Sequence, residues 1–202
     1  MSAHISLIQK GRVFVANHSL KPLTPLGHDA PERVTIGPVT ITETVSTALA
    51  SLASRLGREA EVASVAQAAG IPLPGPGKAA FNTPYGSFWL GPEQWMVLAP
   101  FASHEDITAH LKPLFGDAAS LTEQTDAWVQ FDLTGENLPA LFELLCSLDS
   151  RNMADNTATR SVIEHLGTYV LRRGKDHFTI FGPRSSAASL HHALITAAKS
   201  AF

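Results

Sequence analysis

The chain contains nearly the same pattern of residues twice. Residues 91–100, GPEQWMVLAP, return in kind as residues 174–183, GKDHFTIFGP, 83 positions later. Upstream, residues 52–69 correspond to residues 130–147 at an offset of 78 positions. Solenoid and propeller repeats have periods of about 20–50 residues. A repeat of this length therefore indicates a duplicated half-domain.

Each half has the order strand, glycine, helix, loop, two-stranded hairpin, proline and helix. This order predicts an α+β fold of two βαββα halves, with mixed sheets and packed helices. Residues 44–56 fit both a strand and a helix, and the repeat favours a strand over 48–55 because the matching residues 130–133 continue a clear strand. We therefore expect a single duplicated domain over 34–202, with halves at about 44–116 and 126–202.

Apolar stripes with helical spacing follow the glycine in each half. Their members are Val62, Val65, Ala66 and Ala69 in the first half, and Leu138, Leu141, Phe142 and Leu145 in the second. Residues 34–42 alternate apolar and polar side chains around Gly37 and Pro38, which predicts a bent strand or a hairpin.

Residues 1–33 form an N-terminal arm in this interpretation. Pro22, Pro25, Gly27 and Pro31 punctuate the segment, and no helical or strand period is sustained. Two interpretations stay open: a free, disordered arm, and an arm that becomes ordered on a partner subunit.

The composition excludes several classes of function. The formal net charge of −3 and the pI near 6.3 give no basic footprint for nucleic acid. No apolar run approaches the roughly 20 residues of a membrane span, and the first residues lack the apolar core of a secretory signal. A single cysteine, Cys146, fits a reducing compartment. We expect a cytoplasmic protein.

No catalytic, cofactor-binding or metal site is predicted within this chain. Residues 72–79 end like a phosphate loop, but they lack its leading glycine and its final hydroxyl, so a proline-stiffened connection is favoured. Cys146 has no nearby base in sequence, which favours an inert core thiol. The neighbours His191 and His192 diverge on a helix and cannot easily hold one ion.

One basic cluster is a candidate for contact with a partner. Arg172, Arg173 and Lys175 surround Gly174 at the tip of the predicted second hairpin. Most charged hairpin tips are only solvated, which is the alternative here.

Several short motifs, in order, carry a resemblance to a known family. They are residues 91–100, 124–129 (QTDAWV), 146–149 (CSLD), 158–160 (ATR) and 183–185 (PRS). Together they resemble the gamma subunit of bacterial heterotetrameric sarcosine oxidase, over about residues 45–200. That family is similar in fold to the folate-binding part of the glycine-cleavage aminomethyltransferase.

The resemblance implies a non-catalytic assembly subunit. The family's complex oxidises sarcosine to glycine and yields hydrogen peroxide and methylenetetrahydrofolate. Its alpha, beta and delta subunits would be the partners, and FAD, FMN, NAD and tetrahydrofolate would be bound by those subunits. The chain departs from the family pattern at Leu145 and at residues 150–152, which leaves open a paralogue acting on another N-methyl amine.

Two further functions remain as alternatives. The first is a stand-alone protein that binds folate or another small molecule in an aromatic-lined pocket. Its candidate residues are Tyr85, Trp89, Trp95 and Trp128, which are equally consistent with ordinary core aromatics. The second is an autonomous transferase.

Overall fold

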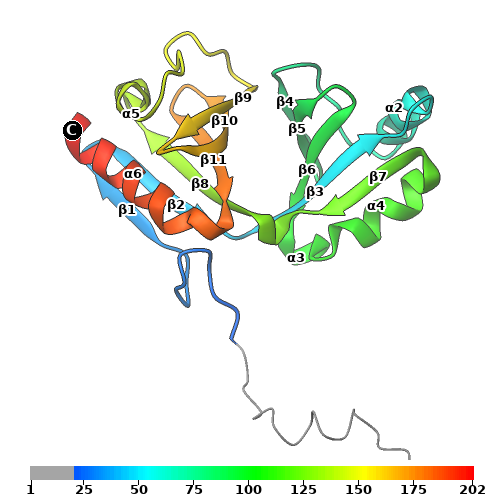
Figure 1. The fold of residues 1–202 in the computed structure, drawn as a ribbon, viewed down its shortest axis with the longest axis horizontal. Coiled ribbons are helices and arrows are strands. Elements are labelled where there is room, and N and C mark those ends of the chain that lie inside the picture. Colours follow the sequence, from blue (N-terminus) through cyan, green and yellow to red (C-terminus); the bar gives the residue numbers. More distant parts are fainter. Residues whose placement is uncertain (1–20) are drawn as a thin grey trace, which may run out of the picture.

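The computed structural model describes residues 21–202, which form two β-sheets with helices on their outer sides (Figure 1). The six-stranded sheet has the order β1 (Arg33–Ile36), β2 (Val39–Thr44), β8 (Trp128–Gly135), β11 (His177–Pro183), β10 (Leu166–Gly174) and β9 (Thr157–Ile163). The five-stranded sheet has the order β4 (Ala79–Phe81), β5 (Gly86–Gly91), β6 (Gln94–Pro100), β3 (Thr47–Ser54) and β7 (Ala119–Glu123).

Helices cover one face of each sheet. Within residues 21–202 the α-helices are α2 (Glu59–Ala68), α3 (Phe101–His104), α4 (Ile107–Phe115), α5 (Leu138–Leu145) and α6 (Ala187–Ala201). Figure 1 shows α5 and α6 beside the six-stranded sheet, and α2 and α4 beside the five-stranded sheet. The buried faces of α2 and α5 contain the predicted apolar stripes, because Val62, Ala66, Leu141 and Phe142 are all buried.

The predicted α+β fold is confirmed, and both strands that the repeat aligns are present as β3 and β8. Residues 34–42 form the hairpin of β1 and β2. All named strands pair antiparallel, whereas mixed sheets were expected. The reason is that β6, the second strand of the β5–β6 hairpin, lies beside β3, so β3 has no parallel neighbour.

The chain crosses between the two sheets twice, and at each crossing two consecutive strands belong to different sheets. The chain passes from β2 in the six-stranded sheet to β3 in the five-stranded sheet, and later from β7 in the five-stranded sheet back to β8. As a result β2 pairs with β8, and β7 pairs with β3. Strand β7 lies in the gap between the predicted halves at 44–116 and 126–202. Strand β2, which comes just before β3 in the chain, therefore belongs to the sheet of β8, and strand β7, which comes just before β8, belongs to the sheet of β3.

The sheets also meet along a second line, at the edges of β4 and β9. An antiparallel bridge joins Lys78 to Thr157. The amide of Ala79 donates to the carbonyl of Asn156 at 2.8 Å, and the amide of Ala158 donates to the carbonyl of Gly77 at 3.0 Å. These bonds cover two strand edges that would otherwise expose unpaired backbone groups.

Three apolar cores result from this arrangement. One lies between the six-stranded sheet and α5 and α6, and a second lies between the five-stranded sheet and α2 and α4. The third, which we call the inter-sheet core, is built from both sheets; its buried members are Leu49, Ala79, Phe88, Met96, Leu98, Ala158, Leu171 and Phe181. The side chains of β8, β10 and β11 alternate between the helix side and the inter-sheet side.

Part of the predicted arm lies on the body of the chain itself. Residues 21–32 contain no helix or strand, and Leu26 packs against the core beneath α6. The buried carboxylate of Glu43 accepts hydrogen bonds from the amides of Leu26 at 2.9 Å and Glu32 at 3.1 Å. The rest of the arm, residues 1–20, is outside the described residues, and contact with a partner stays a prediction.

None of the helices formed within residues 21–202 has the length and apolar character needed to cross a membrane.

Candidate functional site

The basic residues of the predicted hairpin tip do not form one cluster. Arg172 and Arg173 are neighbours in β10, so their side chains point to opposite faces of the sheet. Arg172 lies over the ring of Phe178 on the helix side, and Arg173 lies over the ring of Phe81 on the inter-sheet side. Lys175 is exposed in the turn. Strand alternation alone would have predicted this separation.

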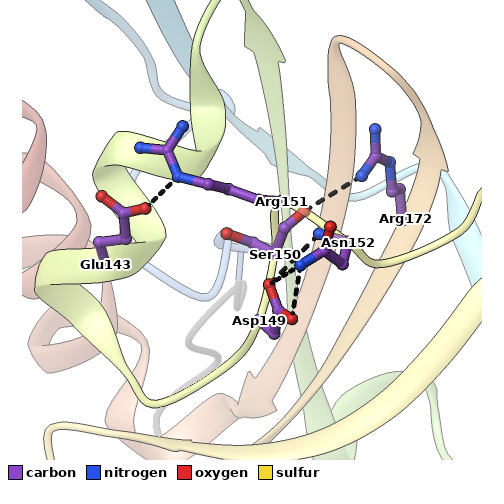
Figure 2. Close-up of polar contacts among 6 residues, drawn as sticks. All are labelled: Glu143, Asp149, Ser150, Arg151, Asn152 and Arg172. Carbon is purple, nitrogen blue, oxygen red and sulfur yellow. Dashed lines mark hydrogen bonds and ion pairs between the residues drawn. The ribbon is translucent and has the colours of Figure 1, made fainter.

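Arg172 fixes the loop between α5 and β9 (Figure 2). One terminal nitrogen, Nη1, donates to the carbonyl oxygens of Ser150 at 3.1 Å and Met153 at 2.5 Å. Its Nε lies 3.1 Å from Oδ1 of Asp155, an ion pair without hydrogen-bond alignment. The side chain is only 14% exposed. Arg172 is therefore a structural anchor for this loop.

The same loop is held at its other side by polar side chains. Figure 2 shows Arg151 reaching the carboxylate of Glu143 on α5, and Asn152 turned toward Asp149. The side-chain nitrogen of Asn152 donates to both carboxylate oxygens of Asp149, at 3.2 and 2.9 Å. These contacts involve the residues at which the sequence departs from the family pattern, so the loop has its own set of tethers.

A partly buried carboxylate, Asp132, organises the inter-sheet side of the six-stranded sheet. Its oxygens accept hydrogen bonds from Thr44 (2.6 Å), Gln130 (2.9 Å), His177 (3.0 Å) and Thr179 (2.6 Å). A carboxylate can only accept, so Nε2 of His177 and Nε2 of Gln130 carry the donated protons. Burial raises the pKa of Asp132, but these four bonds outweigh it and hold the pKa at about 2.

The Asp132 network fixes the orientation of Gln130. Because Nε2 of Gln130 faces the carboxylate, Oε1 points the other way, and this oxygen is buried without a hydrogen-bond partner in residues 21–202. A buried acceptor without a partner costs about 1–3 kcal/mol. Such groups are uncommon and are often associated with a site that another molecule completes.

Gln130 lines a cavity of about 390 Å³ where the chain crosses between the sheets. The walls include residues 22–31, the β2–β3 connection and the β7–β8 connection, together with residues from β3, α3, β8 and the segment after β11. Main contributors are Leu23, Val45, Phe101, Trp128, Gln130 and Arg184. At the rim Leu23 is 50% exposed and Val45 is 41% exposed. We call this region the crossover cavity, and its exposed apolar rim makes it the candidate functional site.

Arg184 links the walls of the crossover cavity. Its Nη2 donates to the carbonyl of Leu23 at 3.1 Å, and its Nη1 lies 3.5 Å from Oδ1 of Asp126. One guanidinium thus ties residues 22–31 to the β7–β8 connection. No local sequence pattern indicates this cavity, because its walls lie far apart along the chain.

Three of the four aromatic residues considered for a binding pocket lie in one apolar core, and the fourth lies elsewhere. Tyr85, Trp89 and Trp95 contribute to the core beneath α2 and α4, where Nε1 of Trp95 donates to the carbonyl of Pro74 at 2.8 Å. Trp128 alone lines the crossover cavity. Cys146 is half-buried at the end of α5. Within residues 21–202, no group of three His, Cys, Asp or Glu side chains is arranged to hold a metal ion.

Comparison with known proteins places the fold. No protein-family model and no curated protein matches the sequence. A chain of the heterotetrameric sarcosine oxidase from Corynebacterium sp. U-96, solved in complex with pyrrole 2-carboxylate, matches with a TM-score of 0.68 at 23% identity. The match covers 80% of this chain and 84% of that chain.

A second structural neighbour is the glycine cleavage system aminomethyltransferase T from Bartonella henselae, with a TM-score of 0.58 at 15% identity. It covers 82% of this chain but only 50% of that chain. This chain therefore has the fold found in a sarcosine oxidase chain and in about half of an aminomethyltransferase, as the sequence resemblance implied. Identities this low show the fold alone.

Proposed function

We propose that this chain is an assembly subunit, corresponding to the gamma subunit, of a cytoplasmic oxidase complex of the sarcosine oxidase type. The observation that carries the proposal is the extent of the match to the Corynebacterium oxidase. It spans 84% of that chain, compared with 50% of the aminomethyltransferase. A chain that corresponds to nearly all of one subunit is best explained as a subunit itself.

In this proposal the chemistry belongs to the partners. The alpha, beta and delta subunits hold FAD, FMN, NAD and tetrahydrofolate and demethylate sarcosine or a related N-methyl amine. The present chain contributes a folded body and a surface for assembly. Its proposed contact surface is the rim of the crossover cavity, because Leu23 and Val45 are exposed apolar side chains on one opening. Exposed apolar groups of this kind are enriched at protein interfaces.

The assembly role is tested by co-expression with flavoprotein and folate-domain polypeptides of the sarcosine oxidase type from the same organism. The tagged chain should retain those polypeptides through affinity purification and gel filtration. The double variant Leu23→Asp and Val45→Asp should lose them with little change in its own melting temperature, since both side chains are already exposed. The control is Leu56→Asp, because Leu56 is 98% exposed and lies outside the cavity.

The main alternative is a stand-alone binder of folate or another small molecule. The unpaired oxygen of Gln130 beside a cavity of about 390 Å³ is the observation that favours it. Calorimetric titration of the isolated chain with tetrahydrofolate decides between the assembly subunit and the stand-alone binder. Micromolar binding that Gln130→Leu abolishes would support the alternative, whereas no heat from the isolated chain together with retained partners would support the subunit.

A further inference from the structure

Arg173 lies at the boundary between the two sheets. It is on the inter-sheet side of β10, and its guanidinium carbon is 3.3 Å from the ring centre of Phe81 in β4. Gly86 of β5 supports this ring closely, since a Cβ at that position would come within 2.8 Å of the Phe81 ring. The stacked arginine is therefore positioned by strands from both sheets.

The charge of Arg173 is not neutralised by a direct partner. Within residues 21–202, its guanidinium forms no ion pair and no hydrogen bond to another side chain or carbonyl. Burial lowers the pKa of Arg173, and the more distant carboxylate of Asp132 only partly opposes this. A half-buried cation without an anion is unfavourable. By contrast, the neighbouring Arg172 donates to two carbonyl oxygens and forms an ion pair with a carboxylate.

Arg173 lines a second cavity, of about 430 Å³, at the end of the five-stranded sheet. Ser46, Thr47 and Asn82 add three polar side chains to its wall, and none of these makes a side-chain hydrogen bond within the described chain. The remaining wall is mostly apolar, with Pro84, Leu98 and Pro100 among its members. An arginine, three free polar groups and an apolar wall thus converge on one opening.

The stacking leaves a specific part of the guanidinium available. Its flat face is used by Phe81, so the N–H groups along its edge remain to bind a ligand. That edge matches a planar carboxylate, which accepts two parallel hydrogen bonds from one arginine. We propose that Arg173 and the cavity beside it form a binding site for a small organic acid, with the carboxylate on Arg173 and the apolar body against Pro84 and Leu98. This site adjoins the crossover cavity, because Thr47 lines both, but it contains neither Leu23 nor Val45 and does not depend on the proposed assembly role.

Benzoate is the probe, because it combines a planar carboxylate with an apolar ring. Titration of the full-length chain, followed through its backbone amide resonances, should give saturable millimolar binding, with the largest shifts at Thr47, Asn82 and Gly86. Benzamide, the neutral analogue, should bind at least about tenfold more weakly, and inorganic phosphate should also be weaker than benzoate. Phosphate binding more tightly than benzoate would overturn the assignment to a carboxylate.

Two variants and one control separate the site from general charge effects. Arg173→Gln should weaken benzoate binding by at least about tenfold, and Asn82→Asp, which keeps the stacked arginine, should also weaken it because it places a second anion at the opening. Lys175→Gln removes a cation from the same hairpin and should change the affinity by less than about twofold. Equal binding by Arg173→Gln and wild type, shifts confined to other residues, or no saturation would each refute the proposal.

Discussion

Replacement of Asp132 by asparagine tests the polar network between the sheets. The carboxylate is 21% exposed and accepts four hydrogen bonds, so its pKa is about 2 in the folded chain against 3.8 for the ordinary group. A pKa that is lower in the folded state means that the charged group stabilises the fold. From this difference, Asp132→Asn should lower the free energy of unfolding by about 2 kcal/mol at pH 6.

The pH dependence has a defined sign. Stability from a lowered carboxylate pKa is fully present above the unfolded value and is lost as the pH falls through the folded value. The advantage of the wild type over Asp132→Asn should therefore be close to constant from pH 7 to pH 5. It should fall to about 1 kcal/mol at pH 3 and to less than about 0.5 kcal/mol at pH 2.

The measurement is urea denaturation, followed by tryptophan fluorescence and circular dichroism at each pH. Asp117→Asn is the control, because the side chain of Asp117 is 93% exposed and its substitution should cost less than about 0.5 kcal/mol. If Asp132→Asn matched the wild type at pH 6, or if its deficit were the same at pH 3 as at pH 6, the assigned network would be wrong.

Three further substitutions test the anchors of the fold, each by urea denaturation. Arg172→Met should cost about 2–3 kcal/mol because two carbonyl oxygens lose a charged donor, whereas Lys175→Met should cost less than about 0.5 kcal/mol; equal effects would contradict the anchoring role. Phe88→Ala should cost about 3–5 kcal/mol, since this ring is fully buried between the sheets, and a loss below about 1 kcal/mol would mean that the sheets do not pack through it. Gly135→Ala should cost about 3 kcal/mol or more, because φ is +134° and a Cβ would lie 2.0 Å from the carbonyl oxygen of Pro38; a neutral effect would exclude the observed β2–β8 pairing.

The repeat predicted most of the architecture because each half has strong local signals. The hairpins at residues 91–94 and 174–177, the strands β3 and β8, and the helices α2 and α5 all follow from apolar spacing and from the offset between the halves. These signals depend on neighbours within about ten residues. They could therefore be read without knowledge of the tertiary structure.

The crossing of the chain between the two sheets could not be predicted in the same way. Strand β7 is five residues long, with only Ala119 and Leu121 apolar, and it pairs with β3 far away in sequence. Nothing in its local pattern identifies the partner strand. The antiparallel placement of β6 beside β3 likewise has no local signal, and the order of elements alone led to the expectation of mixed sheets.

The candidate site was hidden for a related reason. Gln130 and Asp132 alternate with apolar residues in β8, which by itself is typical of a solvent-facing side of a strand. Gln130 is buried and Asp132 is partly buried because the crossing connections and the second sheet cover that side. The basic hairpin is different: the alternation of a strand already implies that Arg172 and Arg173 face opposite ways, and only the choice of face needed the structure.

The central claim, that this chain works as a subunit, is tested most directly by native mass spectrometry. The tagged chain would be co-expressed with flavoprotein and folate-domain polypeptides of the sarcosine oxidase type from the same organism and purified through its tag. We expect one copy of this chain per assembly, and we expect the added mass of bound flavin on the partner polypeptides. The assembly should release hydrogen peroxide when sarcosine or a related N-methyl amine is added. A chain that is recovered alone, while the other polypeptides assemble and turn over the amine without it, would contradict the account.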